Sequence, residues 1–128
     1  MEVQLPVAAV APALGRRALE PFRSRVPVRT FEDLLLVATE MISNAVVHGG
    51  LTERDSIWLR VRRRPSLTRL EVEDHGVGFG RKGPVSPGDV GGRGFMIIAR
   101  LSERWGLESD GLTLVWCELR DATPAPLA

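Results

Sequence analysis

The chain has 128 residues, 44% of them hydrophobic and 26% charged, and its formal net charge is +1. This length predicts one domain with a substantial core, and the charge balance lacks the basic excess of nucleic-acid-binding proteins. Cys117 is the only cysteine, which excludes an internal disulfide and a cysteine-based metal site. Because no secretory signal or membrane-spanning stretch is recognisable, we expect a cytoplasmic protein that binds neither nucleic acid nor membrane.

The N-terminal part of the chain predicts an edge strand over residues 1–6 and a short helix over residues 12–20. Pro12 suits the first turn of that helix, because its missing N–H would have no helical partner there. Pro21 stops or kinks the same helix.

A longer helix is predicted from Phe31 to His48. Thr30 is the predicted N-cap, and Asp33 stands in a capping-box position three residues later. Gly49 and the glycine after it supply the C-terminal stop.

This long helix carries polar residues where a core helix should carry none. Glu40, Asn44 and His48 are spaced i, i+4 and i+8, so they share one strip with Cβ atoms roughly 6 Å apart. Burying a carboxylate or an amide without a partner is costly. The strip therefore requires a polar ligand, a metal ion or a satisfied hydrogen-bond network.

The period of the pattern changes to two after the long helix. Apolar and charged residues alternate over 57–62 and again over 69–74, which predicts a hairpin of half-buried strands with its turn at 63–66. The arginines of this hairpin, which are Arg60, Arg62, Arg63 and Arg64, are interpreted as its solvent-facing side.

The C-terminal part predicts a third helix from Phe95 to near Gly106 and a last strand over 112–119, with a short strand before it as an option. Residues 1–120 are interpreted as one domain and 121–128 as a disordered tail. Together the elements predict an α/β two-layer sandwich, a mostly antiparallel sheet covered on one face by about three helices.

Two glycine-containing motifs follow the hairpin. Asp74-His75-Gly76-Val77-Gly78 places an acid at a strand end, and Gly91-Gly92-Arg93-Gly94 directly precedes the third helix. Glycines at a helix N-terminus let a phosphate approach the free N–H groups and the positive end of the helix dipole. With the helix strip, these motifs indicate a nucleotide site, and residues 76–94, which hold eight of the thirteen glycines, indicate a functional loop.

In this order, the motifs EMISNAVVH, DHGVG and GGRGFMII closely resemble the N, G1 and G2 boxes of the GHKL (histidine kinase-like) ATPase superfamily. The resemblance covers roughly residues 28–120 and implies the Bergerat-type ATP-binding fold, with ATP and Mg²⁺ as cofactors. The small size and the phrase ISNAVVHGG resemble the anti-sigma-factor serine/threonine kinases of bacterial partner-switching systems.

The resemblance implies roles on the phosphate side of the site. Glu40 matches the general base that activates a serine hydroxyl, Asn44 the Mg²⁺ ligand and His48 a basic position near the phosphates. The end of the loop matches the hinge and phosphate-facing part of an ATP lid, at Gly92, Arg93 and Gly94, and Arg93 or Arg81 can approach the γ-phosphate.

On the adenine side, the resemblance implies that Asp74 accepts a hydrogen bond from the adenine amino group. Gly76 and Gly78 match the glycines that let the loop close over the base. Thr113 falls where relatives often place a threonine near the adenine.

The leading hypothesis is an ATP-dependent serine kinase and anti-sigma factor that binds a sigma factor and phosphorylates an anti-anti-sigma partner, with a homodimer as the state that the family suggests. The alternative is a nucleotide-gated binding module without significant kinase activity, which the short lid at 79–90 favours. A third reading, an ATPase without a protein acceptor, lacks the extra domain that couples hydrolysis to motion in larger relatives.

Overall fold

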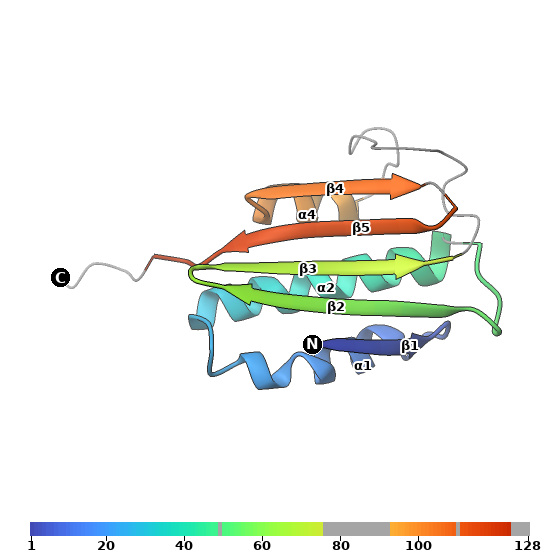
Figure 1. The fold of residues 1–128 in the computed structure, drawn as a ribbon, viewed down its shortest axis with the longest axis horizontal. Coiled ribbons are helices and arrows are strands. Elements are labelled where there is room, and N and C mark those ends of the chain that lie inside the picture. The colour runs from blue at the N-terminus through green and yellow to red at the C-terminus, as the bar shows by residue number, and fades with distance from the viewer. Residues whose placement is uncertain (49, 76–92, 110, 124–128) are drawn as a thin grey trace.

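The computed structural model describes residues 1–48, 50–75, 93–109 and 111–123. Its five strands form one antiparallel sheet in the order β1-β2-β3-β5-β4, with helices packed on one face (Figure 1). This confirms the predicted two-layer sandwich. The elements in chain order are β1 (Glu2–Pro6), α1 (Ala11–Ala18), the 3₁₀ turn η1 (Glu20–Phe22), α2 (Val28–His48), β2 (Ser56–Arg64), β3 (Leu67–Asp74), α4 (Arg93–Leu101), β4 (Arg104–Ser109) and β5 (Thr113–Arg120).

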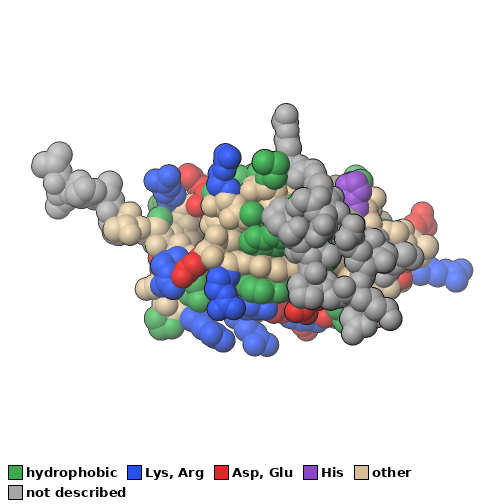
Figure 2. All heavy atoms as spheres, turned by 90° about the horizontal axis from the view of Figure 1, so that it is seen from above, with side chains coloured by type: hydrophobic (Ala, Val, Ile, Leu, Met, Phe, Trp, Pro, Cys, Tyr) green, Lys and Arg blue, Asp and Glu red, His purple; other side chains and the backbone are tan. Residues whose placement is uncertain are grey.

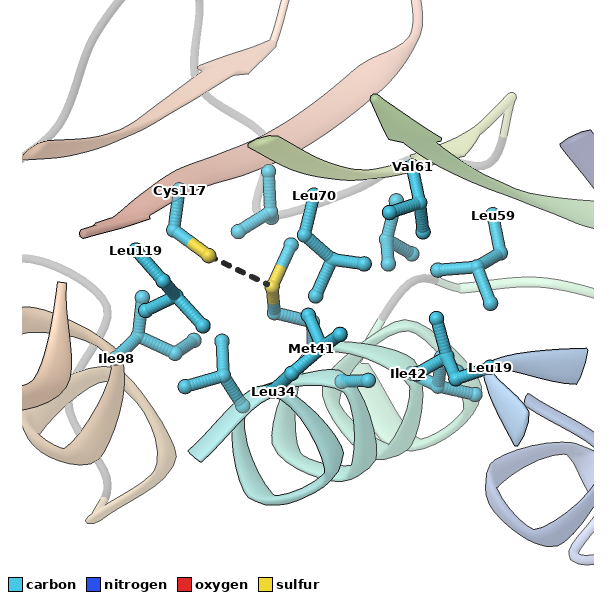
Figure 3. Packing of buried hydrophobic residues seen from close by; sticks show 14 of the residues in the cluster. Leu19, Leu34, Met41, Ile42, Leu59, Val61, Leu70, Ile98, Cys117 and Leu119 are labelled. Carbon is cyan, nitrogen blue, oxygen red and sulfur yellow. Dashed lines mark hydrogen bonds between the residues drawn. The ribbon is translucent and has the colours of Figure 1, made fainter. Parts of the chain in front are cut away.

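The core lies between the sheet and α2, the long central helix. Alternate residues of each strand point toward the helices, so their apolar side chains form rows such as Leu70 and Val72 in β3. In Figure 3 Cys117 of β5 contacts Met41 of α2, with their sulfur atoms 3.9 Å apart. Burial raises the pKa of the Cys117 thiol to about 12, so this cysteine is an unreactive part of the core. Among the described residues, no helix is long and apolar enough to cross a membrane.

The predicted start of the long helix is wrong by a few residues. The helix α2 begins at Val28, and the Phe31 N–H already donates to the carbonyl of Pro27 at 2.9 Å. Thr30 is therefore a buried residue of the first turn and not an N-cap. Pro27 explains the difference, because a proline needs no N–H partner at a helix start and its φ already suits a helix.

The predicted end of the third helix is also wrong. The helix α4 ends at Leu101, and Trp105 and Gly106 belong to β4. The pairing of β4 with the outer edge of β5 satisfies the backbone groups of both strands. The Trp105 ring also packs against Phe95 of α4, with ring centroids 6.0 Å apart. Tertiary pairing therefore overrides the helical pattern here, and the optional short strand is confirmed.

The hairpin between β2 and β3 turns through two residues, Pro65 and Ser66, because Arg64 and Leu67 are already paired. The sequence had predicted that Arg63 and Arg64 belong to the turn. This prediction is wrong, because both residues extend β2. Ser66 has a φ of 64°, in the left-handed region that favours glycine.

We expect Ser66→Gly to stabilise the protein by about 0.5 kcal/mol. Relief of the left-handed strain is worth roughly 1–2 kcal/mol, and the extra flexibility of glycine in the unfolded chain takes back roughly 0.5–1 kcal/mol. A thermal melt should show a rise of a few degrees for Ser66→Gly and none for Ser66→Ala, which keeps the Cβ. A lower melting temperature for Ser66→Gly would contradict this account.

The first residues of the predicted tail are tied to the body of the protein. Asp121 forms a bidentate ion pair with Arg63 at 2.5 and 2.6 Å, and its N–H donates to the Ser66 carbonyl at 2.9 Å. The Ala122 N–H donates to the Thr30 hydroxyl at 2.8 Å. Arg63 thus faces the helix side of the sheet rather than solvent, and residues 124–128 lie outside the described part.

Candidate functional site

At one end of the sheet, the inward-facing apolar rows of β3 and β5 both finish in a polar residue. Val72 lies opposite Val115, and the next inward pair is Asp74 opposite Thr113. Both polar residues are buried, with 2% and 3% of their surface exposed. In Figure 1 this end is at the right. The helix α2 ends there, and the first turn of α4 is the turn nearest to it. Two buried polar side chains at the end of apolar rows make this end of the sheet the candidate site.

Asp74 and Thr113 line a small cavity beneath α2. Asn44 of α2 closes it from the helix side, and its volume is about 10 Å³, room for about one water molecule. The remaining walls are apolar, from Met41, Ala45, Val72 and Val115. Three polar side chains from three separate elements therefore converge in an otherwise apolar enclosure that has room for a small polar group.

Two of these polar groups have an atom with no hydrogen-bond partner among the described residues. They are Asn44 Nδ2 and Thr113 Oγ1, and both atoms are buried. Buried polar atoms are nearly always paired, because an unpaired one costs about 1–3 kcal/mol. Since both unpaired atoms belong to residues that line the same cavity, a polar ligand is the natural partner for them.

The predicted strip on α2 is only partly brought to this cavity. Asn44 lines it, whereas Glu40, one turn earlier, is half-buried and His48, one turn later, is exposed. The sequence had suggested that the whole strip is buried, but the structure buries only part of it. It runs from the apolar interior at Asn44 to the surface at the helix end, because α2 extends past the last inward pair of the sheet.

Residues next to Asp74 in the chain face away from the cavity. Glu73 lies on the outer face of the sheet, where a hydrogen bond from Arg60 lowers its pKa. His75 Nε2 lies 3.4 Å from Glu73 Oε2, so His75 is also directed to the outer face. The alternation of the strand thus separates the buried Asp74 carboxylate from its charged neighbours.

Several predicted residues cannot be placed. Gly76, Gly78, Arg81 and Gly92 lie outside the described residues. Arg93 and Gly94 form the first turn of α4, so the glycine-rich motif does lead into a helix N-terminus. That arrangement agrees with the predicted placement of a helix dipole behind the motif.

The apolar walls of the cavity were not named among the predicted site residues. Met41 and Ala45 flank Asn44 on α2, and Val72 and Val115 precede or follow the polar pair by two residues. The signal for three of them was present in the sequence, because residues at i±2 on a strand and at i±3 or i±4 on a helix lie on the same face as a polar residue. The two periods counted outward from Asp74, Thr113 and Asn44 lead to Val72, Val115 and Met41, whereas Ala45, the direct neighbour of Asn44, follows only from the structure.

We expect Thr113→Val to leave the protein as stable or more stable, because valine has the same shape and removes an unpaired buried hydroxyl. If that hydroxyl serves a ligand, the same change should weaken the binding of ATP with Mg²⁺ by about three- to tenfold. Thermal melting and calorimetry measure the two effects. A loss of stability with unchanged ATP affinity would assign Thr113 a purely structural role.

These side chains fit a nucleotide held with a divalent ion. Asp74 offers a carboxylate acceptor. The Asn44 amide offers an oxygen and an NH₂ group, and rotation of the amide by 180° exchanges which of the two faces the cavity. Mg²⁺ takes few protein ligands when phosphate oxygens complete its shell, so a single amide is a sufficient protein contribution.

The comparison with protein families agrees with this reading. The model for the histidine kinase-like ATPase domain matches residues 6–117 of the chain. The search of curated proteins found no match to this chain. The match runs from the end of β1 into β5, includes the helices that carry the site and spans most of the 128 residues. The chain therefore belongs to the histidine kinase-like ATPase domain family of the GHKL superfamily, whose domains bind ATP.

Proposed function

We propose that this protein is an ATP-dependent serine kinase and anti-sigma factor. It binds a sigma factor, and it transfers the γ-phosphate of ATP to a serine of an anti-anti-sigma protein. The observation that carries the proposal is the convergence of Asp74, Thr113 and Asn44 in one cavity, with unpaired atoms on two of them. The family match supports ATP as a ligand of the domain, and the proposal assigns the ATP to that cavity.

In this arrangement only the amino edge of the base would reach the β3–β5 side of the cavity, because the cavity has room for a small polar group and not for a whole base. Asp74 would accept a hydrogen bond from the adenine amino group, and Thr113 would bond the ring edge or a water beside it. Val72 and Val115, which lie side by side on the same face of the sheet, would contact the base from that one side. A buried carboxylate selects adenine over guanine, since the corresponding position of guanine is a carbonyl that would repel it.

The phosphates would extend toward the α2–α4 side. Asn44 would hold Mg²⁺, which when bound neutralises the phosphate charge. Glu40 lies one helical turn from Asn44 and is half-buried, so its carboxylate would take the proton of an incoming serine hydroxyl. Phosphoryl transfer depends mainly on positioning and charge stabilisation, so these few groups suffice for it.

A single-turnover phosphotransfer assay tests the proposal. The protein is loaded with ATP labelled at the γ-phosphate and mixed with anti-anti-sigma proteins from the same genome. Transfer of label to a serine on one of them, at a rate above that with the protein left out, is the expected result.

Tight ATP binding without transfer to any of these proteins would favour the alternative, a regulator whose partner surface is set by nucleotide. In that case a partner should bind with different affinity in the presence and absence of ATP. Steady phosphate release without partner would instead indicate a free-standing ATPase.

A further inference from the structure

The outer face of the sheet carries a cluster of arginines at the end away from the candidate site. We define the arginine corner as five outward-facing residues near the β2–β3 turn: Arg62, Arg64, Arg69, Arg104 and Arg120. Figure 2 shows basic side chains (blue) gathered at the lower left of the molecule, with acidic side chains (red) beside them. Among the described residues, no helix covers this face.

Three members of the arginine corner are neutralised within the protein. Arg69 pairs with Glu71 at 2.8 Å and with Glu118 at 3.5 Å, and Arg104 lies 3.7 Å from the same Glu118. Arg120 pairs with Glu103 at 2.5 Å. The glutamates of this region are thus already engaged.

Arg62 and Arg64 are different, because both are exposed and neither makes an ion pair with any of the described residues. Arg62 lies directly opposite Arg69 across the strands, an arrangement of like charges that destabilises a sheet. The strand β1 begins opposite Arg60, so Arg62 and Arg64 have no strand partner on their other side. The guanidinium groups of Arg62 and Arg64 are therefore accessible to a partner outside the chain.

We propose that the arginine corner is a docking surface for an acidic segment of a partner protein. Guanidinium groups pair with carboxylates through two parallel hydrogen bonds, which suits Asp and Glu side chains. Leu67 is half-buried between Arg64 and Arg120, so it offers an apolar contact in the middle of the charges. The expected partner segment is therefore acidic with interspersed apolar residues.

A nucleic acid fits this surface less well. The aromatic residue of the region, Trp116, has the Arg69 guanidinium 4.3 Å from its ring centre. It also lies so close to Gly106 that a Cβ there would be 2.6 Å from the indole Nε1. Its ring is thus already covered and is poorly placed to stack on bases, and a net charge of +1 gives little general attraction for a phosphate backbone.

Fluorescence anisotropy tests the proposal on the full chain without nucleotide, so its outcome is independent of the proposed kinase activity. The probe is a fluorescein-labelled peptide of repeating Glu-Glu-Leu units, with a Gln-Gln-Leu peptide as its neutral counterpart. The variant carries Arg62→Glu and Arg64→Glu. The matched control carries Arg17→Glu and Arg54→Glu, two exposed arginines outside the arginine corner, so both proteins have the same net charge.

We expect the acidic peptide to bind wild type and to bind the Arg62/Arg64 variant at least about tenfold more weakly, while the control loses less than about threefold. Raising NaCl to about 0.5 M should weaken wild-type binding, because exposed charges are screened. Retained melting temperature and ATP binding show that both variants are folded.

Three results would overturn the proposal: no binding of the acidic peptide to wild type, equal losses in the two variants, or equal binding of the neutral peptide. An oligo-dT strand that binds more tightly than the acidic peptide, with the same dependence on Arg62 and Arg64, would show that the partner class is wrong.

Discussion

Asp74→Asn is expected to weaken the binding of ATP with Mg²⁺ by at least about tenfold, which corresponds to about 1.4 kcal/mol. The substitution keeps the size of the side chain and replaces a carboxylate oxygen with an NH₂ group. A ligand amino group that meets a carboxylate in wild type would meet a second donor in one orientation of the amide and a weaker acceptor in the other. Because Asp74 is only 2% exposed, water cannot replace the lost interaction.

Isothermal calorimetry of wild type and variant is the measurement. Glu108→Gln provides the matched control, since Glu108 is an exposed carboxylate of β4 and should leave the affinity unchanged. GTP should bind wild type poorly, and the preference for ATP over GTP should fall in Asp74→Asn. An unchanged ATP affinity in a folded Asp74→Asn variant would mean that the base binds elsewhere.

Glu40→Ala is expected to slow phosphate transfer to a partner serine by at least about a hundredfold, the usual contribution of a general base. ATP affinity should change by less than about threefold, because Glu40 is not among the described residues that line the cavity. A slower phosphate transfer at an unchanged ATP affinity would identify Glu40 as a group that acts in the transfer step.

The measurement is single-turnover transfer of labelled phosphate to the partner that the assay above identifies. Glu40→Gln should be nearly as slow as Glu40→Ala, because glutamine fills the space and cannot accept the proton. Glu32→Ala, an exposed glutamate earlier on the same helix, should transfer at the wild-type rate. If Glu40→Ala transfers as fast as wild type, then Glu40 is not the base.

The elements that the sequence predicted best were those whose period is set by a single buried face. In β2 and β3, apolar and polar residues alternate over several residue pairs, and α2 has an apolar face that repeats over several helical turns. These repeats predict both the existence and the type of the three elements. The errors lie at element ends, at Val28 and at Trp105. At Val28 the deciding feature is the proline before the helix, and at Trp105 it is the pairing of β4 with the free edge of β5. The hydrophobic period of the sequence predicts neither.

For the candidate site, the sequence by itself determined the residue types: an acid at a strand end, an amide among apolar helix residues and glycines before a helix, which together indicate a polar ligand. Only the tertiary structure decided which of these meet. Register places Asp74 opposite Thr113, and helix packing sets Asn44 against them and leaves His48 exposed. Contacts between residues distant in the chain depend on strand order and on the rotation of α2 over the sheet, which no local pattern encodes.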